Sequence, residues 1–294
     1  MTAKIIDGKA LAARVRVECR ARAQRLAAAG VVPGLAVILV GDNPASRVYV
    51  ANKARACAEV GVRSDVIALP AGIAEAELLA RIEALNADAA VHGILVQLPL
   101  PPGLDLRRVL ESISRDKDVD GFHLYNVGAL VVGTTIFPPC TPYGVQLLLE
   151  SEGIDVAGQN VVIVGASNIV GKPMALMLMQ KGATVTVCHA GTRDLAQFTI
   201  LADILIVAAG CPRLIVAPMV KKGAVVIDVG INRLADGSLG GDVDFEAVRA
   251  KASFITPVPG GVGPMTVTML IVNTLTSAER APRGLRGASP ALCA

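Results

Sequence analysis

The sequence predicts an α/β protein of two domains, each built on a parallel-rich sheet. Three observations predict this class. Apolar runs alternate with segments of helical period along most of the chain. The runs are continuously apolar, as strands buried on both faces of a parallel sheet are. The length of 294 residues is sufficient for two domains of ordinary size, each with a buried core.

The first half of the chain predicts three strands and two helices. The strands are expected at 35–42, 62–69 and 93–98, and the helices at 45–60 and 75–85. After the prolines at 101–102 the pattern loosens. A further helix is expected to begin at Thr141 or Pro142 and to stop at Gly153. We therefore place a domain boundary near residue 140.

The second half repeats the alternation. Strands are expected at 160–165, 183–189, 203–210 and 224–232, with a helix at 172–181. The segment 253–261 closes the series, and 264–278 has the pattern of a long helix. The tail at 281–294 has no apolar period and is predicted to be disordered.

Composition excludes several classes of protein. The formal net charge is only +3 and the basic residues are scattered, apart from the tail, so an extended nucleic-acid surface is not expected. Six cysteines without a C-x-x-C pair indicate neither a zinc site nor a disulfide framework. The charged N-terminus lacks the pattern of a signal peptide, which predicts a cytoplasmic protein. Two uncharged stretches, 127–149 and 256–278, are interrupted by Pro and Gly, so no membrane span is expected.

The turn IVGASNIVGKP, residues 163–173, follows an apolar run. Five residues separate Gly165 from Gly171, which fits neither the commonest dinucleotide fingerprint nor the nucleotide-triphosphate loop. The order strand, glycine turn, helix and strand over 160–189 is nevertheless that of a Rossmann-type dinucleotide-binding domain. Ser167 offers a hydroxyl, and the following helix start offers free N–H groups to a pyrophosphate. On spacing alone, a turn with glycines for packing is an equal alternative.

The end of the next expected strand bears on the choice of dinucleotide. An NAD site usually has an acid there that holds the ribose hydroxyls. This chain has no carboxylate before Asp194, and His189, Thr192 and Arg193 lie nearby. Absence of the acid favours a 2′-phosphate and therefore NADP, although an ordinary polar loop fits these residues comparably well.

A second group of polar residues lies in the first half. Tyr49 and Lys53 are four residues apart on an expected helix and share a face, with Ser46 one turn earlier. A lysine moves protons near neutrality when burial or a neighbouring cation lowers its pKa, and a tyrosine ring can stack on a flat substrate. Gln97 ends an apolar strand, where ligands bind in parallel sheets. The alternative is that Tyr49 and Lys53 are solvent-exposed residues of a helix surface without a functional role.

Two loops complete the candidates. The segment DKDVDG has Asp116, Asp118 and Asp120 at alternate positions, but it lacks the later glutamate of a calcium loop, so no metal is expected. One carboxylate facing a ligand is the better functional interpretation, and a solvated turn is the alternative. The segment TPVPGGVGPMT, residues 256–266, is stiff and poor in side chains, which permits close backbone approach to a ligand or forms a complex turn.

Seven segments in order resemble the methylenetetrahydrofolate dehydrogenase/cyclohydrolase family over roughly residues 3–278. They are SRVYVANKARAC, GILVQLPLP, DKDVDGFH, PPCTPYGV, VVIVGASNIVGKP, AVVIDVGIN and TPVPGGVGPMT. The resemblance implies NADP-dependent oxidation of 5,10-methylenetetrahydrofolate to the 5,10-methenyl compound and its hydrolysis to 10-formyltetrahydrofolate. One cleft between the domains would serve both reactions.

The resemblance also assigns residues. It implies Lys53 as the catalytic lysine, Gln97 as its partner, Tyr49 as the stacking ring and Asp120 as the residue that grips the pterin. Substrate contacts are expected at Tyr49, Lys53, Val96, Gln97, Leu98, Asp120, Pro259, Gly260, Gly261, Val262 and Gly263. Cofactor contacts are expected at Gly165, Ala166, Ser167, Gly171, Arg193 and Ile231.

The resemblance further implies a discontinuous catalytic domain, 1–140 with 264–280, an NADP domain at 141–263, and a homodimer. One departure concerns Ala190, where many similar bacterial chains carry an Arg for the 2′-phosphate, so Arg193 would have to compensate or the preference for NADP would weaken. Two alternatives stay open at this point. One is a dehydrogenase of the shikimate type, and the other is a silent nucleotide sensor or scaffold.

Overall fold

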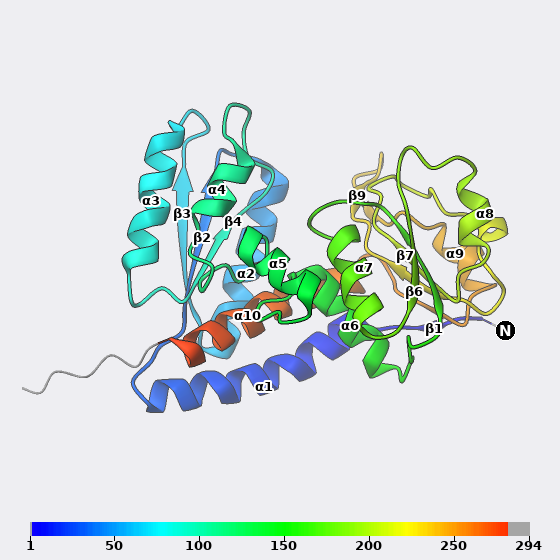
Figure 1. The fold of residues 1–294 in the computed structure, drawn as a ribbon, viewed down its shortest axis with the longest axis horizontal. Helices are drawn as coiled ribbons and strands as arrows, with labels where there is room; N and C mark the ends of the chain where they lie inside the picture. Colours follow the sequence, from blue (N-terminus) through cyan, green and yellow to red (C-terminus); the bar gives the residue numbers. More distant parts are fainter. Residues whose placement is uncertain (1, 282–294) are drawn as a thin grey trace, which may run out of the picture.

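The computed structural model describes residues 2–281, so nearly all of the tail expected to be disordered lies outside the described residues. Two α/β domains lie side by side, and two long helices run beneath the first and reach the near edge of the second (Figure 1). These helices are α1 (Gly8–Ala28) and α10 (Val262–Arg280). The predicted fold class is confirmed.

The first domain contains a three-stranded parallel sheet in the order β3-β2-β4. Its strands are β2 (Gly34–Val40), β3 (Arg63–Leu69) and β4 (Gly93–Val96), and its helices include α2 (Pro44–Val60), α3 (Glu75–Ala87) and α4 (Leu106–Ser112). Every residue of β2 is buried, as its unbroken apolar sequence predicts. Helix α2 begins after Asn43, whose side chain accepts from two backbone N–H groups, and ends at Gly61 in the left-handed conformation.

The second domain contains a six-stranded parallel sheet in the order β1-β11-β8-β7-β5-β6. The strands are β1 (Lys4–Ile5), β5 (Asn160–Val164), β6 (Thr184–Cys188), β7 (Ile204–Val207), β8 (Val225–Asp228) and β11 (Phe254–Ile255). The first residues differ from the expected division of the chain. They pair with β11, so the chain starts in the second sheet before it enters the first domain.

The remaining elements connect and cover the sheets. They are α5 (Leu124–Val132), α6 (Cys140–Ser151), α7 (Gly171–Gln180), α8 (Leu195–Thr199), α9 (Phe245–Arg249), the short 3-10 helix η1 (Ala217–Met219) and the hairpin β9 (Asn232–Arg233) and β10 (Leu239–Gly240). The strand expected at 224–232 ends at Asp228, because the Asp228 carboxylate accepts the Gly230 N–H and turns the chain there. None of the helices within residues 2–281 is both long and apolar enough to cross a membrane.

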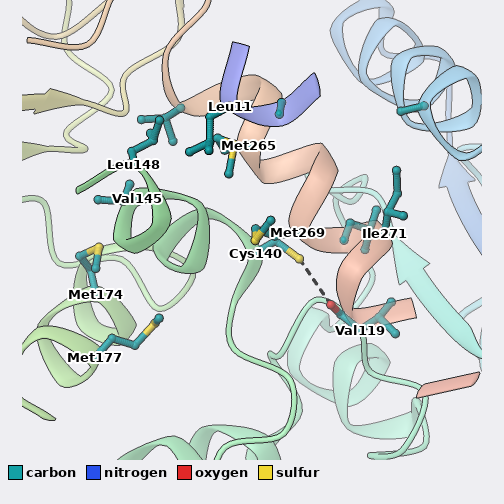
Figure 2. Close-up of a cluster of buried hydrophobic side chains, with 14 of the residues drawn as sticks. Leu11, Val119, Cys140, Val145, Leu148, Met174, Met177, Met265, Met269 and Ile271 are labelled. Carbon is teal, nitrogen blue, oxygen red and sulfur yellow. Dashed lines mark hydrogen bonds between the residues drawn. The ribbon is translucent and has the colours of Figure 1, made fainter. Parts of the chain in front are cut away.

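One continuous core joins α1, α6, α7 and α10 (Figure 2). Val145 and Leu148 of α6 face Met265 of α10, and Leu11 of α1 packs at the same place. Each fully buried side chain of this size contributes about 2 kcal/mol relative to an exposed one. The start of α10 is therefore fixed by apolar contacts with helices of both halves of the chain.

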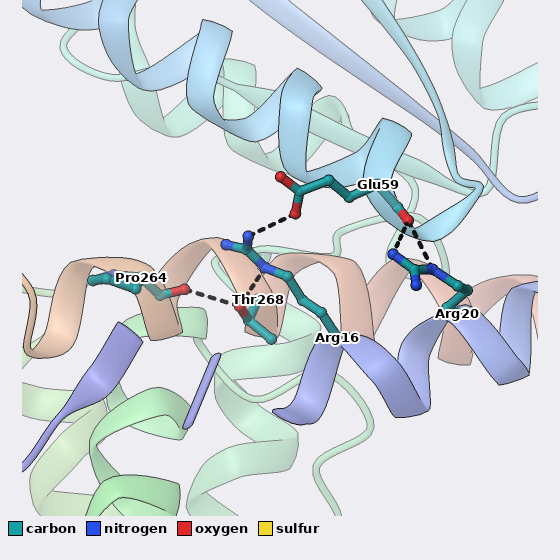
Figure 3. Close-up of polar contacts among 5 residues, drawn as sticks. All are labelled: Arg16, Arg20, Glu59, Pro264 and Thr268. Atoms are coloured by element: carbon teal, nitrogen blue, oxygen red, sulfur yellow. Dashed lines mark hydrogen bonds and ion pairs between the residues drawn. The ribbon is translucent and has the colours of Figure 1, made fainter. Parts of the chain in front are cut away.

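Polar contacts tie α2 to α1 and α10 (Figure 3). Arg16 of α1 donates to Thr268 Oγ1 of α10 at 3.2 Å and to the Glu59 carboxylate at 3.0 Å. Arg20 donates two hydrogen bonds, of 3.0 and 2.9 Å, to the Glu59 carbonyl oxygen near the end of α2, where helical carbonyls lack partners. Helix α1 thus holds α2 in a fixed position relative to α10.

Candidate active site

Lys53 in the middle of α2 meets Gln97, which directly follows the carboxyl end of β4. Lys53 Nζ donates to Gln97 Oε1 at 3.0 Å, and Gln97 Nε2 donates to the Leu98 carbonyl oxygen at 2.8 Å. The backbone N–H of Gln97 also bonds to Ile38 O of β2, which fixes its Cα at the sheet edge. Lys53 forms no ion pair within residues 2–281. The predicted pair is therefore assembled, and its amine is held by a neutral acceptor.

Asp120 faces the same place. Removal from water raises the pKa of its carboxyl group, and the negative charge of Asp118 acts in the same direction. The positive charge of Lys53 and the Cys140 thiol act in the opposite direction, which shows that both groups lie near Asp120. The structure thus brings together Lys53, Gln97 and Asp120, three of the four residues predicted to be catalytic.

Asp118 has a structural task. Its carboxylate accepts the N–H groups of Phe122 at 3.2 Å and His123 at 2.8 Å, and the Asn126 side-chain amide at 2.8 Å. It is 1% exposed, so these bonds hold the turn between Asp120 and α5. No group of three or more His, Cys, Asp or Glu side chains in the described part of the chain is arranged to hold a metal ion.

Tyr49 lies one helical turn before Lys53 and is 37% exposed. Partial burial raises the pKa of its phenol, so the ring presents a neutral aromatic face. Ser46, in contrast, is buried at 3% exposure. The Tyr49 ring is exposed four residues before Lys53, and its role in stacking on a flat ligand stays a prediction.

The PGGVG segment is compressed against the start of α1. Gly260 has φ +113°, a conformation that side chains disfavour, and its carbonyl oxygen accepts the Lys9 N–H at 3.1 Å. The structure differs from the expected loop in one respect, because Val262 and Gly263 already belong to the first turn of α10. A Cβ on Gly263 would lie 3.7 Å from Ile231 Cδ1, so this turn borders a residue predicted to contact the cofactor.

The glycine turn after β5 leaves no room for a side chain at Gly165 or Gly171. Gly165 has φ +121°, and a Cβ on it would lie 2.1 Å from the Ala208 carbonyl oxygen. A Cβ on Gly171 would lie 1.9 Å from Gly165 O. Both glycines are therefore required for packing, and they also leave the backbone of the turn open to a ligand.

The donors of this turn differ from those expected. Ser167 already accepts the N–H of Val170 at 3.1 Å through its hydroxyl and the N–H of Lys172 at 3.1 Å through its carbonyl oxygen, so the start of α7 is largely capped by the turn itself. The backbone N–H groups of residues 166–169 donate to no acceptor within residues 2–281. Free amides in a glycine turn fit the pyrophosphate of a dinucleotide.

The end of β6 forms a compact polar turn. Thr192 Oγ1 accepts the His189 N–H at 2.9 Å, and the Thr192 N–H donates to His189 O at 2.8 Å. Arg193 is exposed and forms no ion pair in the described part of the chain. A free guanidinium with no acid at the strand end fits a ligand that carries a 2′-phosphate.

Comparison with known families decides the identity of this arrangement. Residues 6–120 match the family model described as "Tetrahydrofolate dehydrogenase/cyclohydrolase, catalytic domain", and residues 139–282 match that of the "NAD(P)-binding domain" of the same family. The chain belongs to the tetrahydrofolate dehydrogenase/cyclohydrolase family. The shikimate-type alternative is therefore wrong.

Individual members of the tetrahydrofolate dehydrogenase/cyclohydrolase family are similar over the whole chain. "Bifunctional protein FolD" of Nitrosospira multiformis is 65% identical, covering 98% of this chain and 100% of that protein. The crystal structure of a bifunctional FolD enzyme from Campylobacter jejuni has a TM-score of 0.93 at 56% identity, covering 94% and 99% of the two chains. The Trypanosoma brucei enzyme, described as complexed with NADP cofactor and inhibitor, has a TM-score of 0.93 at 40% identity, covering 96% and 99%.

Sequence reasoning missed two residues that support the site of this tetrahydrofolate dehydrogenase/cyclohydrolase. Asn273 of α10 is buried and donates to Val119 O at 2.8 Å and to Pro138 O at 2.9 Å. The Cys140 thiol donates to Val119 O at 3.4 Å (Figure 2). These bonds fix the backbone on both sides of the Asp120 turn. Cys140 lies within a segment that carries the resemblance, whereas Asn273 sits in a helical pattern that gives no signal.

Proposed function

We propose that one site around Lys53 serves two reactions of one-carbon metabolism. The first is the NADP-dependent oxidation of 5,10-methylenetetrahydrofolate to 5,10-methenyltetrahydrofolate, and the second is the hydrolysis of that product to 10-formyltetrahydrofolate. Family membership supports both activities, and the Trypanosoma brucei relative in complex with NADP supports the cofactor. The observation that carries the assignment to this site is the 3.0 Å bond from Lys53 to Gln97 beside Asp120.

In the oxidation, bound NADP supplies a hydride acceptor. The protein has to hold the methylene carbon of the folate against it, which is a task of positioning. Tyr49 stacks on the folate, Asp120 binds the polar edge of the pterin, and the glycines at 260–261 let the backbone approach closely. The free amides of residues 166–169 bind the pyrophosphate, and Arg193 binds the 2′-phosphate.

In the hydrolysis, Lys53 accepts a proton from the attacking water and later returns it to the departing nitrogen, while the second proton of the water passes to solvent as the formyl C=O forms. Gln97 Oε1 holds the amine in place, and because Gln97 is itself bonded to Leu98 O, its amide cannot flip. This reaction consumes water and needs no cofactor. The two activities can therefore be separated experimentally, because one depends on NADP and the other does not.

The direct test is to mix the purified protein with 5,10-methylenetetrahydrofolate and either NADP or NAD. Reduced cofactor and methenyl absorbance are followed together. Rapid reduction with NADP and only transient methenyl absorbance supports both activities. A lack of reduction with either cofactor contradicts the dehydrogenase, and persistent methenyl absorbance contradicts the cyclohydrolase.

We also propose that the protein is a homodimer joined at one of the two edges of the second sheet. Strand β6 is that edge, and the apolar side chains of Val187, Phe198, Ile200 and Leu201 on β6 and at α8 are exposed. An exposed apolar sheet edge favours pairing with a second copy around a two-fold axis. Leu201→Glu is expected to shift the protein from dimer to monomer in light scattering, and an unchanged mass contradicts this surface.

The remaining assignments concern the chain as a whole. We propose that 1–140 with 264–280 acts as the catalytic domain and 141–263 as the cofactor domain, with the shared cleft between them, although β1 pairs within the second sheet. Helix α10 packs against α1 and α2, which supports its return to the first domain, and it also packs extensively against α6. Five described cysteines are unpaired, which is consistent with a cytoplasmic location, and the small net charge argues against a nucleic-acid partner.

A further inference from the structure

Asp242 is a buried carboxylate that none of the sequence patterns indicates. It is 0% exposed. Its Oδ2 accepts the backbone N–H groups of Ala209 at 2.7 Å and Gly210 at 2.8 Å, and its Oδ1 accepts the Asn232 side-chain amide at 2.7 Å. One side chain thus connects the loop that follows β7 with the segment that follows β8.

The loop after β7 lies at the point where the strand order of the sheet reverses. Strand β5 pairs with β6 on one side and with β7 on the other. In open parallel sheets, ligands bind outside the carboxyl ends of the strands at such a switch point. Gly165 at the end of β5 packs against Ala208 O with no room for a Cβ. Ala208 therefore borders the expected dinucleotide site, and the amides of residues 209 and 210 that Asp242 holds come next in the chain.

The hydrogen bond from Asn232 to Asp242 connects Asp242 with the part of the site formed by Ile231 and the start of α10. Asn232 follows Ile231, whose Cδ1 lies 3.7 Å from the position of a Cβ on Gly263. Gly263 is in the first turn of α10, beside the glycines expected to contact substrate. A shift of Asn232 would therefore move the Ile231 side chain relative to α10.

The backbone of Asp242 is held in turn by a second buried carboxylate, that of Asp228. Asp228 Oδ1 accepts the Asp242 N–H at 3.0 Å, and Asp228 Oδ2 accepts the Val243 N–H at 3.0 Å. A Cβ on Gly241 would lie 1.8 Å from Asp228 Oδ2, so the backbone at 241–243 is pressed against this carboxylate. Asp242 is consequently a fixed point, and the two segments bonded to it take their position from it.

We propose that Asp242 is a positioning residue for NADP. By holding the 209–210 amides and Asn232, it fixes the two loops that border the glycine turn, and it thereby sets the affinity for the dinucleotide without taking part in folate hydrolysis. This inference rests on the proposed function. The proposal adds Asp242 to the determinants of cofactor binding. Asp242 lies 32 and 33 positions in sequence from Gly210 and Ala209, whose backbone N–H groups it orders.

The test uses hydrogen-bond polarity. In Asp242→Asn the side chain has one acceptor oxygen, so its NH₂ group must face either the Asn232 amide or the two backbone N–H groups. In both cases a donor faces a donor and hydrogen bonds are lost. In Asn232→Asp two carboxylates face each other. In the double variant, the amide introduced at position 242 can accept from the backbone and donate to the carboxylate introduced at position 232, which restores every bond. Asp244→Asn, whose side chain forms no hydrogen bond within residues 2–281, is the matched control.

Two measurements distinguish cofactor positioning from a general structural effect. The Kd for NADP is measured by calorimetry in the absence of folate, and hydrolysis of 5,10-methenyltetrahydrofolate is measured in the absence of cofactor. Each single variant is expected to raise the NADP Kd at least about tenfold, as loss of a buried charge-assisted bond does. Hydrolysis is expected to stay within about twofold of the unchanged protein, and the double variant is expected to recover NADP affinity.

Three results would overturn the proposal. They are an unchanged NADP Kd in Asp242→Asn, an equal loss of affinity and hydrolysis, and a folded double variant that still binds NADP weakly. If a single variant folds poorly, the double variant decides the question, because its hydrogen bonds are complete. Hydrolysis that is absent from the unchanged protein as well would instead contradict the proposed function, so the two failures are distinguishable.

Discussion

Gly8 at the start of α1 lies directly against Gly261 at the start of α10. A Cβ on Gly8 would come within 1.8 Å of the Gly261 carbonyl oxygen, a distance at which the backbone must move. The neighbouring residues are joined as well, because the Lys9 N–H donates to Gly260 O at 3.1 Å. Helix α1 therefore determines where the 259–261 loop, which is predicted to contact substrate, can lie.

Gly8→Ala should impair both activities. The added methyl group is expected to displace the 260–261 backbone, to cost about 1 to 3 kcal/mol of unfolding free energy, and to lower both rates at least about tenfold. Gly72→Ala, where nothing lies within 4 Å of the added Cβ, is the matched control. Denaturant unfolding and the two rate assays check this, and a Gly8→Ala protein with unchanged rates would show that the contact does not position the loop.

Lys53→Met should abolish hydrolysis while leaving the fold intact. Removal of a positioned acid and base is expected to lower the rate by at least about a hundredfold. The exposed Lys222→Met variant controls for the loss of one positive charge. Hydrolysis is followed by the loss of methenyl absorbance, and circular dichroism monitors the fold. Full cyclohydrolase activity in the Lys53 variant would remove Lys53 from its proposed role.

Strands β2, β4, β5, β7 and β8 could be predicted because continuous apolar runs report burial. The long helix α1 was not predicted, because most of its buried positions carry small residues that give a weak apolar period. The two-residue strand Lys4–Ile5 could not be predicted, because it is too short to show a period and its partner lies about 250 residues away. The start of α10 was placed two residues late, because Pro264 is typical of a first helical position whereas Val262 and Gly263 already belong to the helix.

From local pattern, the candidate site could be predicted where its residues lie on regular elements, whereas Asp120, which lies in a turn, was assigned by the family resemblance. Tyr49 and Lys53 share a helix face, and Gln97 ends a strand, so their neighbourhood follows from local pattern. Asn273 and Asp242 could not be found in this way, because their partners are set by tertiary contacts between distant segments. Buried polar residues of this kind have meaning only once the backbone groups they satisfy are known.

Arg193→Ser should weaken discrimination between the two dinucleotides. Because Arg193 is exposed, has no ion pair in the described residues and follows a strand end without an acid, we expect the KM for NADP to rise about tenfold. The KM for NAD should change little. Arg233→Ser, on the hairpin, is the control for lost charge. An equal rise of KM for both cofactors would exclude recognition of a 2′-phosphate by Arg193.

The stability of the protein should fall below neutral pH because of His92. Its imidazole is buried, and Nδ1 accepts the Gly34 N–H at 3.1 Å, an arrangement that requires the neutral ring. Burial lowers the pKa of His92, Lys117 and Arg63 lower it further, and Asp88 opposes them. The unfolded chain thus binds the proton more readily, so this stabilisation is complete above the ordinary value of about 6.5 and is lost as the pH falls below it.

In His92→Asn, Oδ1 can accept the same N–H without titrating. We therefore expect the difference in unfolding free energy between the two proteins to shift in favour of His92→Asn from pH 7.5 to 5.5, as measured by urea denaturation. His123→Asn is the matched control, because His123 Nδ1 likewise accepts a backbone N–H, that of Tyr125 at 3.0 Å. A pH-independent difference for His92→Asn would mean that His92 does not titrate on unfolding in this range.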